Sequence, residues 1–149
     1  MKTNMKENNF DQEYVYMMIN DDFDNKFKFG FSKEPYERMK QLSKTNLARP
    51  MELFYVWEVS NMTKAEAIIH HNYASVRDTR NREFFYIDKD LYDNYGNFQT
   101  SPDVKRVCLE AHVEEITDIL EASPIEIYSK LWGHEYIRQY LMNKRRRNA

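Results

Sequence analysis

Four side chains have types suited to proton transfer or to phosphate binding: the phenol of Tyr16, the ammonium of Lys28, the guanidinium of Arg38 and the carboxylate of Glu83. A guanidinium offers paired, planar donors to a phosphate and stays charged at any physiological pH. A carboxylate can hold Mg²⁺ while waters and a substrate phosphate fill the remaining positions. A phenol, with a reference pKa of about 10, needs a nearby cation to lose its proton readily. Each residue also has an ordinary structural interpretation, as a sheet tyrosine, a solvated lysine or arginine, or an edge-strand carboxylate.

Histidine, cysteine and the basic C-terminus supply the remaining candidates. His70 and His71 are adjacent on an expected helix, so they point about 100° apart and cannot share a metal. His70 follows Glu66 by one turn, and either lines a site or packs through a hydrogen bond to backbone or carboxylate. Cys108 has no partner for an intramolecular disulfide, and we expect it to be a buried residue that packs as a small hydrophobic side chain. The last basic run is either a solvated helix end or an anchor for a phosphate backbone, and consists of Lys144, Arg145, Arg146 and Arg147.

The elements that must position these groups alternate in type along the chain. Strands are expected where β-branched and aromatic residues cluster or alternate with polar ones, at 14–19, 26–31, 52–59 and 83–87. Helices are expected from Ser32 and Pro35 to about Lys44, and from Asn61 or Thr63 to Tyr73. The order β-β-α-β-α-β predicts an α/β (α+β) domain, with a small antiparallel sheet flanked by helices.

The expected organisation has three parts. Residues 1–11 read as a flexible N-terminus, 12–96 as the mixed domain, and 103–149 as a helical C-terminal segment beyond a boundary at Gly96–Pro102. That segment is expected to hold an acidic amphipathic helix at 104–122 and, after Ser123-Pro124, a last helical stretch that ends in the basic tail. Its helices are candidates for homo-oligomer contacts.

Composition narrows the class of protein. The chain has 149 residues, of which 42% are hydrophobic and 15% aromatic, which argues against disorder. A formal net charge of -2 supplies no strong field for a polyanion, so any nucleic-acid contact must come from a local patch. The lone cysteine suggests a reducing compartment, namely the cytoplasm, or the cytoplasm or nucleus of an infected host for a viral protein. No run of 18 apolar residues occurs, so no membrane partner is expected.

An ordered set of short motifs then stands out between Tyr14 and Asp88. Tyr14-Val15-Tyr16 is followed by Asn20, Lys28-Phe29-Gly30 comes next, and Arg38 lies ten residues beyond Lys28. Later matches are Glu66-x-x-x-His70, Tyr73, Arg77 and Glu83-Phe84-Phe85. Together they resemble the GIY-YIG nuclease superfamily, in the branch of phages and large DNA viruses where Lys replaces the leading Tyr of the second triplet.

The resemblance implies a metal-dependent endonuclease that hydrolyses phosphodiester bonds in DNA. Tyr16 would assist proton removal with Lys28 as its cation, Arg38 would hold the phosphate, and Glu83 would bind a single Mg²⁺ or Mn²⁺ ion. His70 would line the site. The expected nucleic-acid contacts are Lys26, Lys28, Arg38, Arg77, Lys144, Arg145, Arg146 and Arg147.

The sequence also departs from the family pattern. Lys28 replaces the second Tyr, Tyr14 replaces the first Gly, and Leu42 stands where some members carry His. The late Asn of the family is matched by Asn94 or Asn97. Two alternatives therefore stay open: a catalytically weak or inactive nucleic-acid-binding module, and a viral protein-binding factor that uses the acidic helix near Glu110–Glu121.

Overall fold

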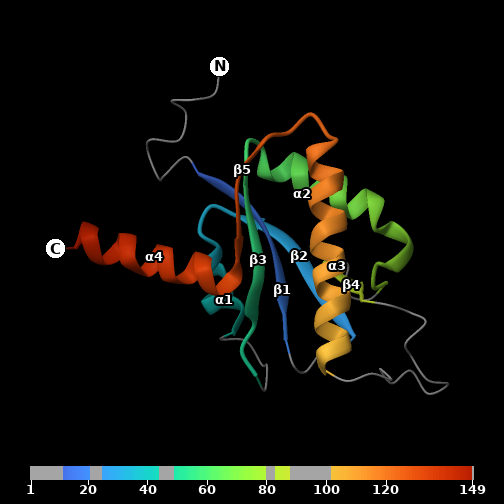
Figure 1. Ribbon diagram of the computed structural model, residues 1–149, viewed down its shortest axis with the longest axis horizontal. Helices are drawn as coiled ribbons and strands as arrows, with labels where there is room; N and C mark the ends of the chain where they lie inside the picture. The colour runs from blue at the N-terminus through green and yellow to red at the C-terminus, as the bar shows by residue number, and fades with distance from the viewer. Residues whose placement is uncertain (1–11, 21–24, 44–48, 80–82, 88–101, 149) are drawn as a thin grey trace.

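The protein forms a five-stranded antiparallel sheet covered by helices on both faces (Figure 1). The computed structural model describes residues 12–20, 25–43, 49–79, 83–87 and 102–148. The strand order is β4-β2-β1-β3-β5, and each adjacent pair is antiparallel. The strands are β1 (Glu13–Ile19), β2 (Lys26–Ser32), β3 (Glu52–Val59), β4 (Phe84–Tyr86) and β5 (Ile127–Trp132). The helices are α1 (Pro35–Ser43), α2 (Met62–Asn72), the 3-10 turn η2 (Ala74–Val76), α3 (Pro102–Glu121) and α4 (Gly133–Arg147). The predicted α+β class is confirmed.

The first four strands and two helices lie where the sequence predicts them. The Ser32 hydroxyl accepts a hydrogen bond from the Glu34 amide at 2.9 Å, just before α1 begins at Pro35. The Asn61 side chain caps α2 by accepting from the Lys64 amide at 3.1 Å. These local signals explain why the β-β-α-β-α-β order could be derived without tertiary information.

Alternate residues of each central strand enter two separate cores, because both faces of the sheet are covered. One core lies under α2 and α3 and is centred on Trp57, whose indole Nε1 donates to Thr117 Oγ1 at 2.9 Å. The other lies under α1 and α4 and contains Tyr16, Val56 and Tyr136. The Tyr140 hydroxyl of α4 donates to Glu37 Oε2 of α1 at 2.9 Å, which joins the two helices over this second core.

The C-terminal segment contains its two expected helices, α3 and α4, but the expectation of a wholly helical segment was wrong. Ile127–Trp132 forms β5, which pairs with β3 from Val59↔Ile127 to Tyr55↔Trp132 and so completes the sheet. Helix α4 starts directly afterwards at Gly133, where an added Cβ would lie 1.8 Å from the Leu53 carbonyl oxygen. This segment is therefore built into the same sheet as the first four strands. The expected flexible N-terminus, and the expected boundary up to Ser101, lie outside the described residues.

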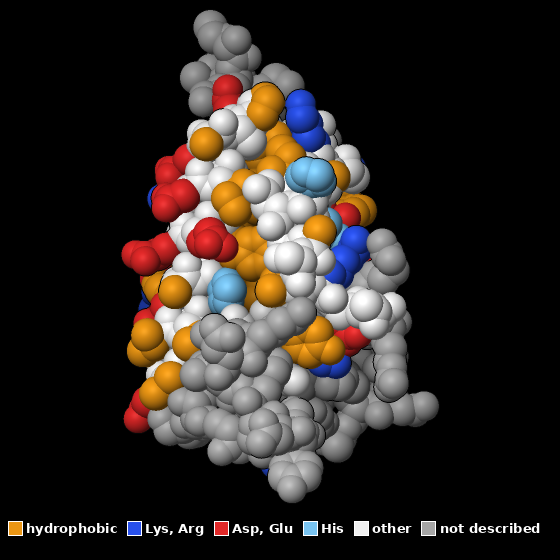
Figure 2. Space-filling model, turned by 90° about the vertical axis from the view of Figure 1, so that its right-hand side faces the viewer, with side chains coloured by type: hydrophobic (Ala, Val, Ile, Leu, Met, Phe, Trp, Pro, Cys, Tyr) orange, Lys and Arg blue, Asp and Glu red, His pale blue; other side chains and the backbone are white. Residues whose placement is uncertain are grey.

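The face formed by α2 and α3 carries acidic side chains gathered along one side and only scattered basic ones (Figure 2). Exposed acidic residues of α3 include Glu114, Asp118 and Glu121. Within the described ranges, none of the helices combines the length and the apolar character that crossing a membrane requires.

Candidate active site

Tyr16 lies against the second strand because its partner there is a glycine. Tyr16 and Gly30 are opposite each other in the β1–β2 register. A Cβ on Gly30 would lie 2.7 Å from the Tyr16 hydroxyl oxygen and 2.9 Å from its Cζ, so any larger residue would displace the ring. The phenol is thereby held on the face covered by α1, and Tyr16 is only 1% exposed.

Lys28 and Glu83 form an ion pair at the point where the short strand β4 begins. Lys28 Nζ lies 2.5 Å from Glu83 Oε2, and the Glu83 carbonyl accepts from the Phe29 amide at 3.2 Å. The lysine side chain is 3% exposed, whereas that of Glu83 is 55% exposed. The hydrogen bond from Lys28 lowers the pKa of Glu83 despite partial burial, and the charges of Lys28 and Arg38 lower it further.

Arg38 reaches the same place from α1. Burial raises the pKa of Tyr16 to about 12, while a hydrogen bond and the positive charge of Arg38 oppose this rise. The charges of Glu83 and Glu66 raise the pKa of Tyr16 further, so these carboxylates are also near the phenol. Tyr16, Arg38 and Glu83 therefore meet at one site, although β1, α1 and the approach to β4 supply them separately.

The expectation that Lys28 lowers the pKa of Tyr16 is wrong. The net shift is upward, and the cation that opposes it is Arg38. The physical reason is that the Lys28 ammonium is paired with Glu83, and burial of the phenol outweighs the neighbouring guanidinium. Tyr16 is consequently a neutral phenol at physiological pH.

His70 approaches the site from α2 with both ring nitrogens engaged. Its Nε2 lies 3.0 Å from the Phe29 carbonyl oxygen, and its Nδ1 lies 3.0 Å from Arg77 Nη2. A carbonyl can only accept and a guanidinium can only donate, so Nε2 carries the proton and Nδ1 accepts. Through these two contacts His70 braces β2 against Arg77, as in the packing interpretation of this histidine.

Glu66 is the residue for which sequence reasoning gave no role. Its Oε2 lies 3.9 Å from His70 Nε2. Burial raises the pKa of Glu66 and the charge of Glu83 adds to the rise, while the charges of Lys28 and Arg77 oppose it. Two carboxylates thus lie near Lys28. The signal was present in the one-turn spacing of Glu66 and His70, but spacing alone does not show that the side chain turns toward β2.

The other residues predicted to contact nucleic acid fall into two groups. Lys26 and Arg77 lie beside β4, and the basic run lies at the end of α4. Lys26 pairs with Asp78 at 2.7 Å, and the Arg77 guanidinium lies 6.0 Å from the centre of the Phe85 ring. The basic run forms the exposed last turns of α4, and its Lys144 lies 3.8 Å from Glu37. Asn94 and Asn97 lie outside the described residues.

The donor set fits a magnesium ion held by few protein ligands. No group of three or more His, Cys, Asp or Glu side chains suited to a metal occurs in the described part of the chain. Glu83 Oε2 binds Lys28, and the Glu83 side chain is 55% exposed, so a hydrated cation can reach the carboxylate from solvent. Mg²⁺ is commonly held by one or two carboxylates together with waters and substrate phosphate. Glu83 meets this requirement, and Glu66 is the second acidic group nearby.

Comparison with protein families finds a match to the T5orf172 domain over residues 13–98. This region is more than half of the chain. The chain belongs to the T5orf172 domain family. All seven residues of the cluster lie within the T5orf172 region, whereas α3, β5 and α4 follow it: Tyr16, Lys28, Arg38, Glu66, His70, Arg77 and Glu83. Searches of curated proteins and of solved structures gave no match.

Proposed function

We propose that this T5orf172 protein is a metal-dependent endonuclease that hydrolyses phosphodiester bonds in DNA through a GIY-YIG-type site. The observation that carries the proposal is the convergence of Tyr16, Arg38 and Glu83 from three separate elements. A phenol, a guanidinium and a carboxylate at one place supply a proton relay, a phosphate clamp and a cation ligand. The resemblance of the short motifs to GIY-YIG nucleases supports the same reaction.

Glu83 is the proposed ligand of a single Mg²⁺ or Mn²⁺ ion. When bound, such an ion would supply charge stabilisation at the phosphate and acidify a bound water. Lys28 keeps Glu83 ionised to a lower pH than a free glutamate, so the carboxylate is available as a ligand throughout the neutral range.

Arg38 and Tyr16 are the proposed contacts to the reacting phosphate. Arg38 can bind two phosphate oxygens with parallel N–H donors and stabilise the charge that develops there. Because burial keeps Tyr16 protonated, its phenol acts as a relay, which accepts a proton from the attacking water as it passes its own proton to the nearby Glu66 carboxylate. His70 then acts as a positioning residue that holds the end of α2 against β2.

The test is cleavage of supercoiled plasmid in the presence of Mg²⁺ or Mn²⁺. Wild type should nick or linearise the plasmid, and Glu83→Gln and Arg38→Lys should each lose activity by about a hundredfold or more. Glu114→Gln, on the exposed face of α3, is the matched control and should cut like wild type. Equal cutting by Glu83→Gln and wild type would mean that the site is wrong.

A second candidate, a catalytically inactive nucleic-acid-binding module, is favoured by the Lys28–Glu83 ion pair. This pair occupies one oxygen of the only proposed metal ligand. Under this function, wild type would shift DNA in a salt-dependent manner without cutting it in either metal, and Glu83→Gln would bind as wild type does.

A further inference from the structure

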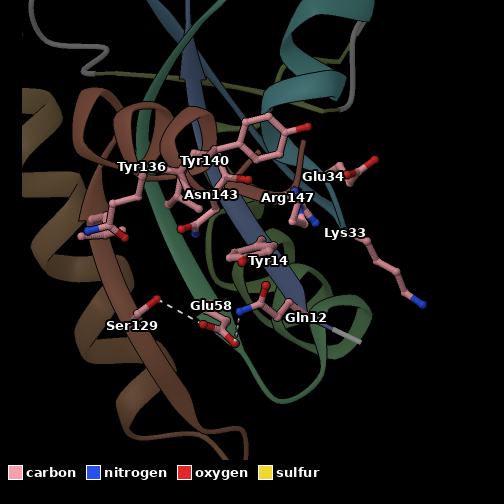
Figure 3. Close-up of a pocket in the computed structure, with 13 residues that line it drawn as sticks. Gln12, Tyr14, Lys33, Glu34, Glu58, Ser129, Tyr136, Tyr140, Asn143 and Arg147 are labelled. Carbon is pink, nitrogen blue, oxygen red and sulfur yellow. Dashed lines mark hydrogen bonds between the residues drawn. The ribbon is translucent and has the colours of Figure 1, made fainter. Parts of the chain in front are cut away.

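A groove of about 560 Å³ lies on the same face of the sheet as Tyr16, between the strands and α4 (Figure 3). Tyr14 lies at its centre, and Glu58 of β3 and Ser129 of β5 lie on the sheet side. Tyrosines of α4 line the opposite side, and the cations Lys33 and Arg147 lie at its margin. The proposed nuclease chemistry uses none of these residues.

Glu58 is an unusual group to find in such a groove, because it is only 8% exposed. Among the described residues, its two oxygens accept long hydrogen bonds, from Gln12 Nε2 at 3.5 Å and from Ser129 Oγ at 3.4 Å. Hydrogen bonds to an ionised carboxylate are normally about 2.7–2.9 Å from nitrogen donors. No lysine or arginine of the described residues forms a salt bridge with Glu58. Both oxygens therefore keep the capacity to accept stronger donors from a ligand.

The groove also offers aromatic rings beside this carboxylate. The rings of Tyr14 and Tyr136 are 5.6 Å apart in an edge-to-face arrangement, and those of Tyr136 and Tyr140 are 6.2 Å apart and nearly parallel. Burial raises the pKa of Tyr14 and the negative charge of Glu58 raises it further, and the two residues are opposite each other in the β1–β3 register. Flat aromatic walls with a polar acceptor are the usual means of binding an unstacked nucleobase.

We propose that this groove binds an unpaired guanine of a nucleic-acid strand, with Glu58 accepting hydrogen bonds from the base and Tyr14 stacking on it. A carboxylate is an acceptor at both oxygens, so its best partner has two adjacent donors. Guanine has such a pair in N1–H and the N2 amino group. Adenine and cytosine each place a donor next to an acceptor on that edge, and thymine flanks its one donor with acceptors.

The position of the groove links it to the proposed cleavage site, and in this respect the inference rests on the proposed function. Tyr14 and Tyr16 lie on the same face of β1 two residues apart, or about 7 Å. A guanine on Tyr14 would thus place a neighbouring phosphate within reach of Tyr16 and Arg38. Lys33 and Arg147 would contact the strand on either side.

The test is binding of fluorescein-labelled single strands of five nucleotides, measured by anisotropy in EDTA. The strands are thymine tracts whose central base is guanine, hypoxanthine or adenine. The wild-type protein should bind the guanine strand about tenfold more tightly than the adenine strand. The hypoxanthine strand, which lacks the N2 amino group, should bind with intermediate affinity. Equal binding of the guanine and adenine strands would overturn the inference.

Glu58→Gln tests the residue itself, because the amide replaces one acceptor with a donor while keeping the shape. It should bind the guanine and adenine strands equally. Glu52→Gln, at the exposed start of the same strand, is the control and should keep the preference. An undiminished preference in folded Glu58→Gln would also refute the assignment. Because EDTA removes the metal, a protein that prefers guanine but never cuts plasmid would refute only the nuclease, and one that cuts without preference would refute only the guanine site.

Discussion

Gly30 is the residue that allows the phenol of Tyr16 to lie on β2. In Gly30→Ala the new Cβ would overlap the Tyr16 ring, which is buried and cannot swing aside without disturbing the core. We expect this substitution to lower the free energy of unfolding by about 1–3 kcal/mol, as overpacking typically does. Urea denaturation followed by tryptophan fluorescence measures the change.

A double-mutant cycle gives the control for Gly30. Tyr16→Val removes the ring that Ala would strike, so Gly30→Ala should be much less destabilising in the Tyr16→Val background. The same loss in both backgrounds would locate the clash elsewhere on β2.

The Lys28–Glu83 pair predicts a definite dependence of stability on pH. Glu83→Gln leaves a buried ammonium without its anion, and should lower the free energy of unfolding at pH 7 by about 1–2 kcal/mol. The estimate is below the value for a fully buried pair because solvent screens the half-exposed carboxylate. Since the folded-state pKa of Glu83 is lowered, its stabilisation is complete above the unfolded value of about 4.3 and is lost as pH falls through the lower folded value.

The measurement is the difference in stability between wild type and Glu83→Gln from pH 7 to pH 3. It should be constant down to about pH 5 and should shrink below about pH 4. Lys28→Met/Glu83→Gln should recover part of the loss, because the unpaired buried ammonium is removed as well. A difference that grows as the pH falls would contradict the pairing.

For single residues, the sequence predicts which side chains share a site, but it does not predict their pKa values or tautomers. The resemblance carried by the ordered motifs was sufficient to propose that Tyr16, Arg38 and Glu83 share one site. The raised pKa of Tyr16 depends on burial beneath α1, and the tautomer of His70 depends on Arg77 and the Phe29 carbonyl. Neither is visible in residue spacing, since each arises from contacts between elements.

Among the elements, α4 depends on its first residue for its position on the sheet. An alanine side chain at Gly133 would overlap the Leu53 carbonyl, which is backbone and cannot rotate away. Gly133→Ala should therefore lift α4 from β3 and lower the free energy of unfolding by about 3 kcal/mol. Thermal unfolding and limited proteolysis at α4 measure the two effects. His134→Ala, at the exposed neighbouring position, should stay within about 0.5 kcal/mol of wild type, and an equally stable Gly133→Ala would show that α4 needs no close approach.

The elements that follow local rules were predicted well, and β5 shows where such rules fail. The hairpin, the capped helices and β3 each carry their own periodicity and boundary residues. Ile127–Trp132 also contains β-branched and aromatic residues, but it lies between two helices, and its partner β3 is far away in sequence. Its strand form comes from the unpaired edge of β3, which no local pattern reveals.

For the molecule as a whole, the distribution of charge says more than the net charge about where a nucleic-acid strand would bind. A net charge of -2 gives no general attraction to a polyanion, and α3 presents acidic groups on the face away from the proposed site. The basic end of α4 lies on the opposite face, where Arg147 borders the groove and Tyr140 joins α1. Binding of a nucleic-acid strand should therefore depend on the basic residues at the end of α4.

The salt dependence of the affinity for a nucleic-acid strand shows whether the basic end of α4 contacts phosphates or is simply a solvated helix end. Each phosphate neutralised on a single strand adds about 0.7 to the magnitude of the slope of log K against log salt. Arg146→Gln/Arg147→Gln should therefore weaken binding of all strands alike and reduce that slope by about 1–1.5. Lys105→Gln/Arg106→Gln on α3 makes the same change in net charge and should leave the slope unaltered, because Arg106 pairs with Glu110 at 3.1 Å on the far side of the sheet. A slope that falls equally in both variants would mean that total charge governs binding, and an unchanged slope in the α4 variant would make its tail a solvated end.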